Sequence, residues 1–118
     1  MDVRGTWSSN AINVSVSTFY PLIGPYPTTQ LEFDAYEAAS RVMFQSWIDS
    51  SSPLGIIQFV NTKQVTLDYD TIRAALGYEK INFLGCSYGT FRAAAYAAEF
   101  PQRVGRFVMD SVVQHGLV

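Results

Sequence analysis

Residues 85–89, Gly-Cys-Ser-Tyr-Gly, constrain the fold more than any other part of this sequence. They follow residues 80–85, Lys-Ile-Asn-Phe-Leu-Gly, which predict a buried strand. They precede an alanine-rich stretch over residues 88–99 that predicts a helix, closed by Pro101. Glycines on both sides of a serine, placed between a strand and a helix, indicate a sharp strand-to-helix turn. The sequence therefore predicts that the Ser87 side chain projects beyond the end of a sheet.

The same turn has the features of a nucleophile elbow, with Ser87 as the nucleophile. We expect Ser87 to have a positive φ, and we expect Gly85 and Gly89 to remove side chains that would collide where the strand and helix pack closely. The helix N-terminus carries partial positive charge, which favours negative charge nearby. The backbone N–H of Tyr88 is then placed to donate to an oxyanion.

Two other interpretations of this motif are open. Residues 85–89 could form a tight glycine-rich turn in which Ser87 is a bystander. Cys86 could be the nucleophile instead, but its position at the end of the strand favours a small buried side chain with a structural role.

The elements around the motif predict an α/β fold. A helix over residues 62–76 is expected to end at Gly77 in a left-handed cap, and a second strand is expected over residues 106–110. Strands that alternate with helices predict a parallel sheet with helical crossovers. The apolar face expected for the 62–76 helix comprises Val65, Tyr69, Ile72 and Leu76.

The first half of the sequence is less regular. Residues 1–28 are expected to be a divergent loop region, with a weakly indicated short strand over residues 12–16. A helix is expected from Thr29, which has capping-box spacing to Glu32, and it ends at residues 50–53. Residues 55–60 are apolar but too short to classify. The apolar face expected for the long helix comprises Tyr36, Ala39, Met43 and Trp47.

Composition excludes several classes of protein. The 118 residues suit one domain, and 48% hydrophobic residues are enough to build a core. A net charge of −2 with scattered basic residues gives no indication of a nucleic-acid partner. The single cysteine allows neither an internal disulfide nor a cysteine-rich zinc site. Neither a membrane span nor a signal peptide is apparent, so the sequence as given is expected to be soluble and unexported.

Residues 70–90 and 96–113 resemble the tripeptidyl aminopeptidase and proline iminopeptidase branch of the α/β-hydrolase superfamily. The similar segments include the Ser-Tyr-Gly-Thr elbow and a Phe-Pro-x-Arg-Val-x-Arg turn at residues 100–106. Residues 2–8 look like the Asp-x-Arg-Gly-x-Gly-x-Ser segment of this branch, except that Trp7 stands where the family usually has glycine. The resemblance covers roughly residues 62 to 115.

The resemblance implies a partial, incomplete α/β-hydrolase fold. It places the start of the chain after the third core strand of the family and its end after the sixth. The chain is then a truncated core over residues 1–118, with a helix and connection at 29–61 and a nucleophile-elbow unit at 62–118. The second oxyanion donor, the catalytic acid loop and the catalytic histidine of the family would then lie elsewhere. Only Ser87 and the Tyr88 N–H are carried over.

Four other ionisable residues lie after the motif or on the helix before it. Asp110 ends the second strand and is a candidate acid, although a structural aspartate is the preferred interpretation. His115 is the only histidine and a candidate base, but it lies five residues from Asp110 where the family uses two distant loops. Asp68 and Arg73 are expected on a solvated helix face, because their spacing does not bring them together.

The function implied by the resemblance is serine hydrolysis that releases N-terminal residues from peptides through an acyl-enzyme on Ser87. Two alternatives are open: a non-catalytic remnant, truncated gene product or chain that pairs with a complementary fragment, and an esterase acting on a small ester. No cofactor, metal, nucleic-acid or membrane partner is expected. The isolated chain is expected to be inactive, because its triad is incomplete.

Overall fold

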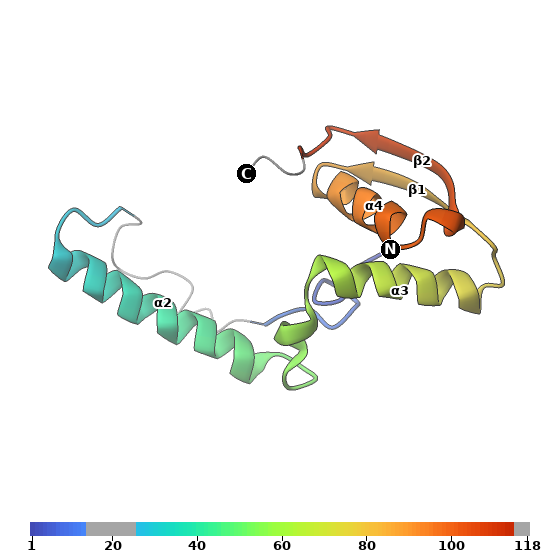
Figure 1. Cartoon of the computed structure of the whole chain (residues 1–118). Coiled ribbons are helices and arrows are strands. Elements are labelled where there is room, and N and C mark those ends of the chain that lie inside the picture. The colour runs from blue at the N-terminus through green and yellow to red at the C-terminus, as the bar shows by residue number, and fades with distance from the viewer. Residues whose placement is uncertain (14–25, 115–118) are drawn as a thin grey trace. The chain divides into compact units, whose positions relative to one another are not determined.

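The computed structural model describes residues 1–13 and 26–114, which separate into two compact units, Met1–Val60 and Asn61–Val118. Figure 1 labels the helices and strands of each unit. The first contains helix α2 (Gln30–Ser50) and the 3-10 helix η1 (Ile56–Phe59). The second contains, in chain order, α3 (Thr62–Ala75), β1 (Ile81–Cys86), α4 (Tyr88–Glu99), the 3-10 helix η2 (Pro101–Arg103) and β2 (Val104–Asp110).

The first residues of the chain form a tight turn. The Gly5 N–H donates to the Ser9 carbonyl at 2.9 Å. Trp7 adopts φ 43°, the left-handed conformation that glycine adopts most easily, and its side chain is 85% exposed. The turn therefore keeps a glycine-like backbone at the position where the family usually has glycine. Gly5 itself has φ 82°, and a Cβ there would lie 3.0 Å from a methyl group of Val60, so glycine is favoured at this position.

The short strand expected over residues 12–16 is not seen in its described part. Ile12 and Asn13 belong to no strand, and residues 14–16 lie outside the described ranges. The Asn13 N–H donates instead to the Ser51 hydroxyl at 3.0 Å, which ties this segment to the residue after α2.

Helix α2 begins and ends where the sequence predicts. The capping box at Thr29 is confirmed: the Glu32 N–H donates to the Thr29 hydroxyl, and the Thr29 N–H donates to the Glu32 carboxylate, each at 3.2 Å. The predicted apolar face is the partly covered one, but no residue of α2 is buried. Residues 56–59, which the sequence left unclassified, form η1.

The second unit is a small parallel α/β structure, as predicted. Strands β1 and β2 pair in parallel, with Leu84 opposite Val108 and Cys86 opposite Asp110. Strand β2 begins at Val104, two residues earlier than expected. Helix α4 connects the strands and contacts both of them and α3 (Figure 1). This arrangement places the start of α4 at the carboxyl end of β1.

The core of this unit lies around α4. Ala93 and Tyr96 are fully buried, and Val65 of α3 is nearly so. The Tyr96 ring lies 5.1 Å from the Phe100 ring and 6.1 Å from the Phe107 ring, between centroids. Aromatic side chains from α4 and β2 therefore fill the space between the helix and the sheet.

The apolar face expected for α3 is only half correct. Val65 is buried and Tyr69 is partly buried, but Ile72 and Leu76 are exposed. The covered face of α3 includes polar residues instead. The predicted left-handed residue after this helix is confirmed, with Gly77 at φ 75°.

One face of the two-stranded sheet is uncovered within this unit. Leu84 is 78% exposed and Val108 is 58% exposed, and the two are paired across the strands. The side chains that alternate with them, Phe83 and Phe107, are partly buried toward α4. The described part of this unit therefore buries one face of its sheet and exposes apolar residues on the other.

Candidate active site

Ser87 lies between β1 and α4 as the N-cap residue of the helix, with φ 52° and ψ −122°. The predicted positive φ is confirmed, and this region is uncommon for a residue that has a Cβ. Ser87 is exposed, and its side chain does not cap the helix. The hydroxyl is therefore presented outward instead of being used to satisfy the first turn of α4.

The steric role predicted for the two glycines holds for only one of them. A Cβ on Gly85 would lie 2.7 Å from the Gly89 carbonyl oxygen and 3.1 Å from the Thr90 nitrogen. A Cβ on Gly89 would meet no atom within 4 Å among the described residues. The expectation that Gly89 avoids a collision is therefore wrong. The close packing of β1 and α4 requires only that residue 85 has no side chain, because the Gly89 backbone passes directly over it.

Tyr88 is the first residue of α4, so its N–H has no carbonyl one turn earlier to bond. It lies directly after Ser87, at the helix end whose partial charge is positive. The Tyr88 side chain is held by its hydroxyl, which lies 2.9 Å from the Thr62 hydroxyl at the start of α3. The Arg92 guanidinium lies over its ring, 5.0 Å from the centroid. This N–H therefore lies beside Ser87 at the positive end of the helix.

Asp110 and Ser87 are brought together through their backbones. The Ser87 N–H donates to the Asp110 carbonyl at 3.1 Å, and Asp110 itself is exposed. The Ser87 N–H is therefore already engaged with a backbone carbonyl. His115, the candidate base, lies outside the described residues.

The expectation of a buried structural Cys86 is wrong: the thiol is exposed in the described structure. The reason is strand alternation. Gly85 faces α4 and is buried, so Cys86, the next residue of β1, lies on the same uncovered sheet face as Leu84.

The sequence interpretation missed a cluster of charged residues centred on Asp70. The Arg73 Nε donates to Asp70 Oδ1 at 2.8 Å, the Tyr96 hydroxyl donates to the same oxygen at 3.2 Å, and Arg103 pairs with Oδ2. Hydrogen bonds from Arg73 hold the Asp70 pKa at about 2, with further lowering by Arg103 and Tyr96. Burial raises the pKa of Tyr96, and so does its hydrogen bond to Asp70.

This Asp70 cluster corrects the placement of Arg73 on a solvated face. The Arg73 side chain is only 12% exposed, and its Nη1 donates to the Tyr78 carbonyl at 2.5 Å. Asp68 is also partly covered rather than fully solvated. The spacing of three residues between Asp70 and Arg73, which suits an ion pair on a helix, was the signal available in the sequence.

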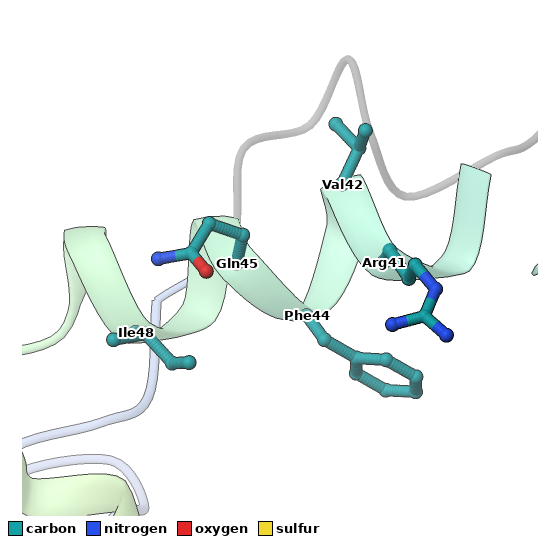
Figure 2. Close-up of a pocket in the computed structure, with 5 residues that line it drawn as sticks. All are labelled: Arg41, Val42, Phe44, Gln45 and Ile48. Atoms are coloured by element: carbon teal, nitrogen blue, oxygen red, sulfur yellow. The ribbon is translucent and has the colours of Figure 1, made fainter. Parts of the chain in front are cut away.

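A hollow on the surface of α2 does not resemble a catalytic site. Arg41, the one charged residue among the described residues that line it, forms an ion pair with Glu37 at 2.5 Å. None of these described lining residues is a nucleophile or a carboxylate. Figure 2 shows the five lining residues, Arg41, Val42, Phe44, Gln45 and Ile48.

The described ranges, 1–13 and 26–114, contain no group of three histidine, cysteine or acidic side chains arranged to hold a metal ion. None of the helices there is both long and apolar enough to cross a lipid bilayer.

Comparisons with known proteins agree with this geometry. The family model for the alpha/beta hydrolase fold matches residues 21–116. The chain is 37% identical to tripeptidyl aminopeptidase of Streptomyces lividans over 93 residues, which are 79% of this chain and 17% of that protein. It is 54% identical to serine protease Hip1 of Mycobacterium bovis over 54 residues, 46% of this chain and 10% of that protein. It is also 36% identical to putative hydrolase YuaR of Escherichia coli over 58 residues, 49% of this chain and 12% of that protein.

The chain thus spans less than a fifth of the length of these relatives. The strand–turn–helix geometry at Ser87 and the match over residues 21–116 both indicate an α/β-hydrolase fold. The chain belongs to the α/β-hydrolase family, and it contains part of that fold.

Proposed function

We propose that this chain supplies the nucleophile, Ser87, of a serine hydrolase that releases short N-terminal pieces from peptides. The observation that supports this most is the Ser87 backbone, held at φ 52° and ψ −122° between β1 and α4 with its side chain exposed. The names of the Streptomyces and Mycobacterium relatives, an aminopeptidase and a serine protease, favour peptides over esters as substrates.

In the proposed reaction the Ser87 hydroxyl oxygen attacks the carbonyl carbon of the scissile peptide bond, and its proton passes to a general base. The Tyr88 N–H donates to the oxyanion of the tetrahedral intermediate. The C–N bond then breaks, the amine leaves with the proton from the base, and an ester on Ser87 remains. Water attacks this ester, releasing the acid and restoring the serine.

We propose further that the isolated 118 residues carry out this reaction very slowly. A base must be hydrogen-bonded to the serine and oriented by a third group. The sequence has one histidine, and it lies only five residues beyond the exposed Asp110. Ser87 would then lack an efficient general base, although its backbone has the conformation expected of the nucleophile.

A fluorophosphonate probe tests the nucleophile without requiring a full catalytic cycle. The chain would be treated with the probe alone and with added imidazole, which can act as a diffusible base, and the labelled residue located by mass spectrometry. We expect slow labelling of Ser87 that imidazole accelerates. Ser87→Ala should abolish it, and Cys86→Ser, which removes the exposed neighbouring thiol, should leave it unchanged.

The possible results separate the two proposals. Rapid stoichiometric labelling without imidazole would show that the chain has its own base and would contradict the proposed inactivity only. A folded chain whose Ser87 stays unlabelled with imidazole present would contradict its assignment as nucleophile and favour a non-catalytic remnant.

A pair of probes tests the substrate class. A phosphonate carrying a tripeptidyl group with a free amino end should label Ser87 faster than a simple alkyl fluorophosphonate, after correction for their intrinsic reactivities. The opposite order would favour an esterase.

A further inference from the structure

The side chain of Thr90, in the first turn of α4, makes two hydrogen bonds while fully buried. Its Oγ1 lies 2.7 Å from the Ser87 carbonyl oxygen and 3.0 Å from the Val113 nitrogen. The Val113 N–H can only donate, so the Thr90 oxygen is the acceptor in that bond. The single hydroxyl proton is then donated to the Ser87 carbonyl, so the Thr90 hydroxyl both donates and accepts a hydrogen bond.

These bonds complete a set of contacts that hold the Ser87 backbone on both sides. On one side, its N–H donates to the Asp110 carbonyl at 3.1 Å. On the other, its carbonyl accepts from the Thr90 N–H at 2.9 Å as well as from the Thr90 hydroxyl. A serine at φ 52° persists only where its surroundings over-determine it, and these three bonds do so.

A second residue with positive φ lies in the segment that this side chain holds. Ser111 has φ 54°, and it lies directly after Asp110. The segment from Asp110 to Val113 is held at one end by the Ser87 N–H and at the other by the Thr90 hydroxyl. Thr90 therefore connects Ser87, after β1, to the segment after β2 that contains Ser111.

We propose that Thr90 is a positioning residue for Ser87. Its hydroxyl fixes the strained backbone of the nucleophile against the chain that follows β2, and so keeps the Ser87 oxygen and the Tyr88 N–H in one relative geometry. This proposal rests on the proposed function of Ser87.

The chain offers a matched control for Thr90. Thr66 is also buried, and its hydroxyl donates to the Lys63 carbonyl three residues earlier at 2.8 Å. This is the same local bond that Thr90 makes to Ser87, in a different helix and away from the elbow. Thr66→Val therefore removes a buried hydroxyl and its bond without touching Ser87.

The experiment compares Thr90→Val, Thr90→Ser and Thr66→Val in the 118-residue chain. Hydrogen exchange resolved to single amides should show a Val113 N–H that exchanges about 10-fold faster in Thr90→Val, as expected for one lost hydrogen bond. Imidazole-assisted labelling of Ser87 should slow by roughly 10- to 100-fold in the same variant, because small displacements at a reacting group have effects of this size. Thr90→Ser should restore both, and Thr66→Val should change neither.

Several results would overturn the proposal. One is faster Val113 exchange with unchanged labelling, since the contact would then not serve the nucleophile. Others are slow labelling in Thr90→Ser or equal slowing in Thr66→Val. If Thr90→Val does not fold, hydrogen exchange of the parent chain decides: a Val113 amide that is unprotected from exchange would contradict the proposal. Absent labelling of Ser87 in the parent would instead contradict the proposed function itself.

Discussion

At the scale of single residues, the absence of a side chain at position 85 decides whether α4 can begin directly against β1. A methyl group there would lie 2.7 Å from the Gly89 carbonyl oxygen, a backbone atom that cannot move without displacing the first turn of the helix. Gly89 itself has open space around its missing Cβ. The two glycines of the motif therefore have different roles, although the sequence pattern treats them alike.

This difference predicts opposite effects for the same substitution. Gly85→Ala should destabilise the chain by roughly 2 kcal/mol or more, because overpacking against backbone forces a shift. Gly89→Ala should be neutral or stabilising by up to about 1 kcal/mol, because alanine is the better helix former. Urea unfolding of the two variants beside the parent measures both. Equal destabilisation by the two substitutions would show that the elbow does not depend on close approach at position 85.

At the scale of elements, the Asp70 carboxylate links α3 to both α4 and η2. It accepts from Arg73 within its own helix, from Tyr96 of α4, and from Arg103 of η2. The carboxylate is 16% exposed, so losing its charge would leave donors from three elements with a weaker acceptor. The polar side of α3 is therefore part of the packing, which explains why Ile72 and Leu76 lie outside it.

This arrangement predicts that Asp70 stabilises the fold above its ordinary pKa. The pKa of Asp70 is lowered from 3.8 to about 2, so its stabilising effect is complete only above about pH 5 and is lost as pH falls toward 2. Asp70→Asn should cost roughly 2 kcal/mol near neutral pH, the usual net value of hydrogen bonds to a charged group, and much less near pH 2.

Denaturant unfolding of Asp70→Asn at several pH values measures this effect. Glu79→Gln is the control, because Glu79 is an exposed acid of the same unit. A cost for Asp70→Asn that stays constant down to pH 2 would show that shape, not charge, is what the substitution removes.

At the scale of the whole molecule, each unit buries little of its apolar surface. Fully buried apolar side chains in the second unit gather around α4, while Leu84 and Val108 form an exposed pair on the other side of the sheet. In the first unit, α2 has no buried residue and exposes Phe33, Val42 and Phe44. Exposed apolar surface of this kind promotes association.

We therefore predict that the 118-residue chain associates in solution and binds a dye that recognises exposed apolar surface. Substituting Leu84 with lysine should reduce both, because it places a charge on the uncovered sheet face. Light scattering after size-exclusion chromatography, with dye fluorescence, measures the effect. A monomeric parent chain with no dye binding and a cooperative unfolding transition would contradict this.

The sequence by itself determined the local structure. The capping box at Thr29, the left-handed Gly77, the strand before Ser87 and the positive φ of Ser87 all follow from the nearest few residues, and all are present. The parallel pairing of β1 and β2 also followed, because a helix between two strands allows little else. These features depend on backbone sterics and short-range hydrogen bonds, which a sequence pattern records directly.

Tertiary structure alone decided which side chains meet. It turned Asp70 and Arg73 inward beside Tyr96 and Arg103, left Cys86 on an uncovered face, and gave Thr90 a partner 23 residues away in Val113. Such contacts depend on how α3, α4 and the strands are packed together, and residues far apart in the chain carry no periodic signal of it. The sequence could therefore locate the serine, whereas the side chains that hold it in place became visible only once the elements were packed.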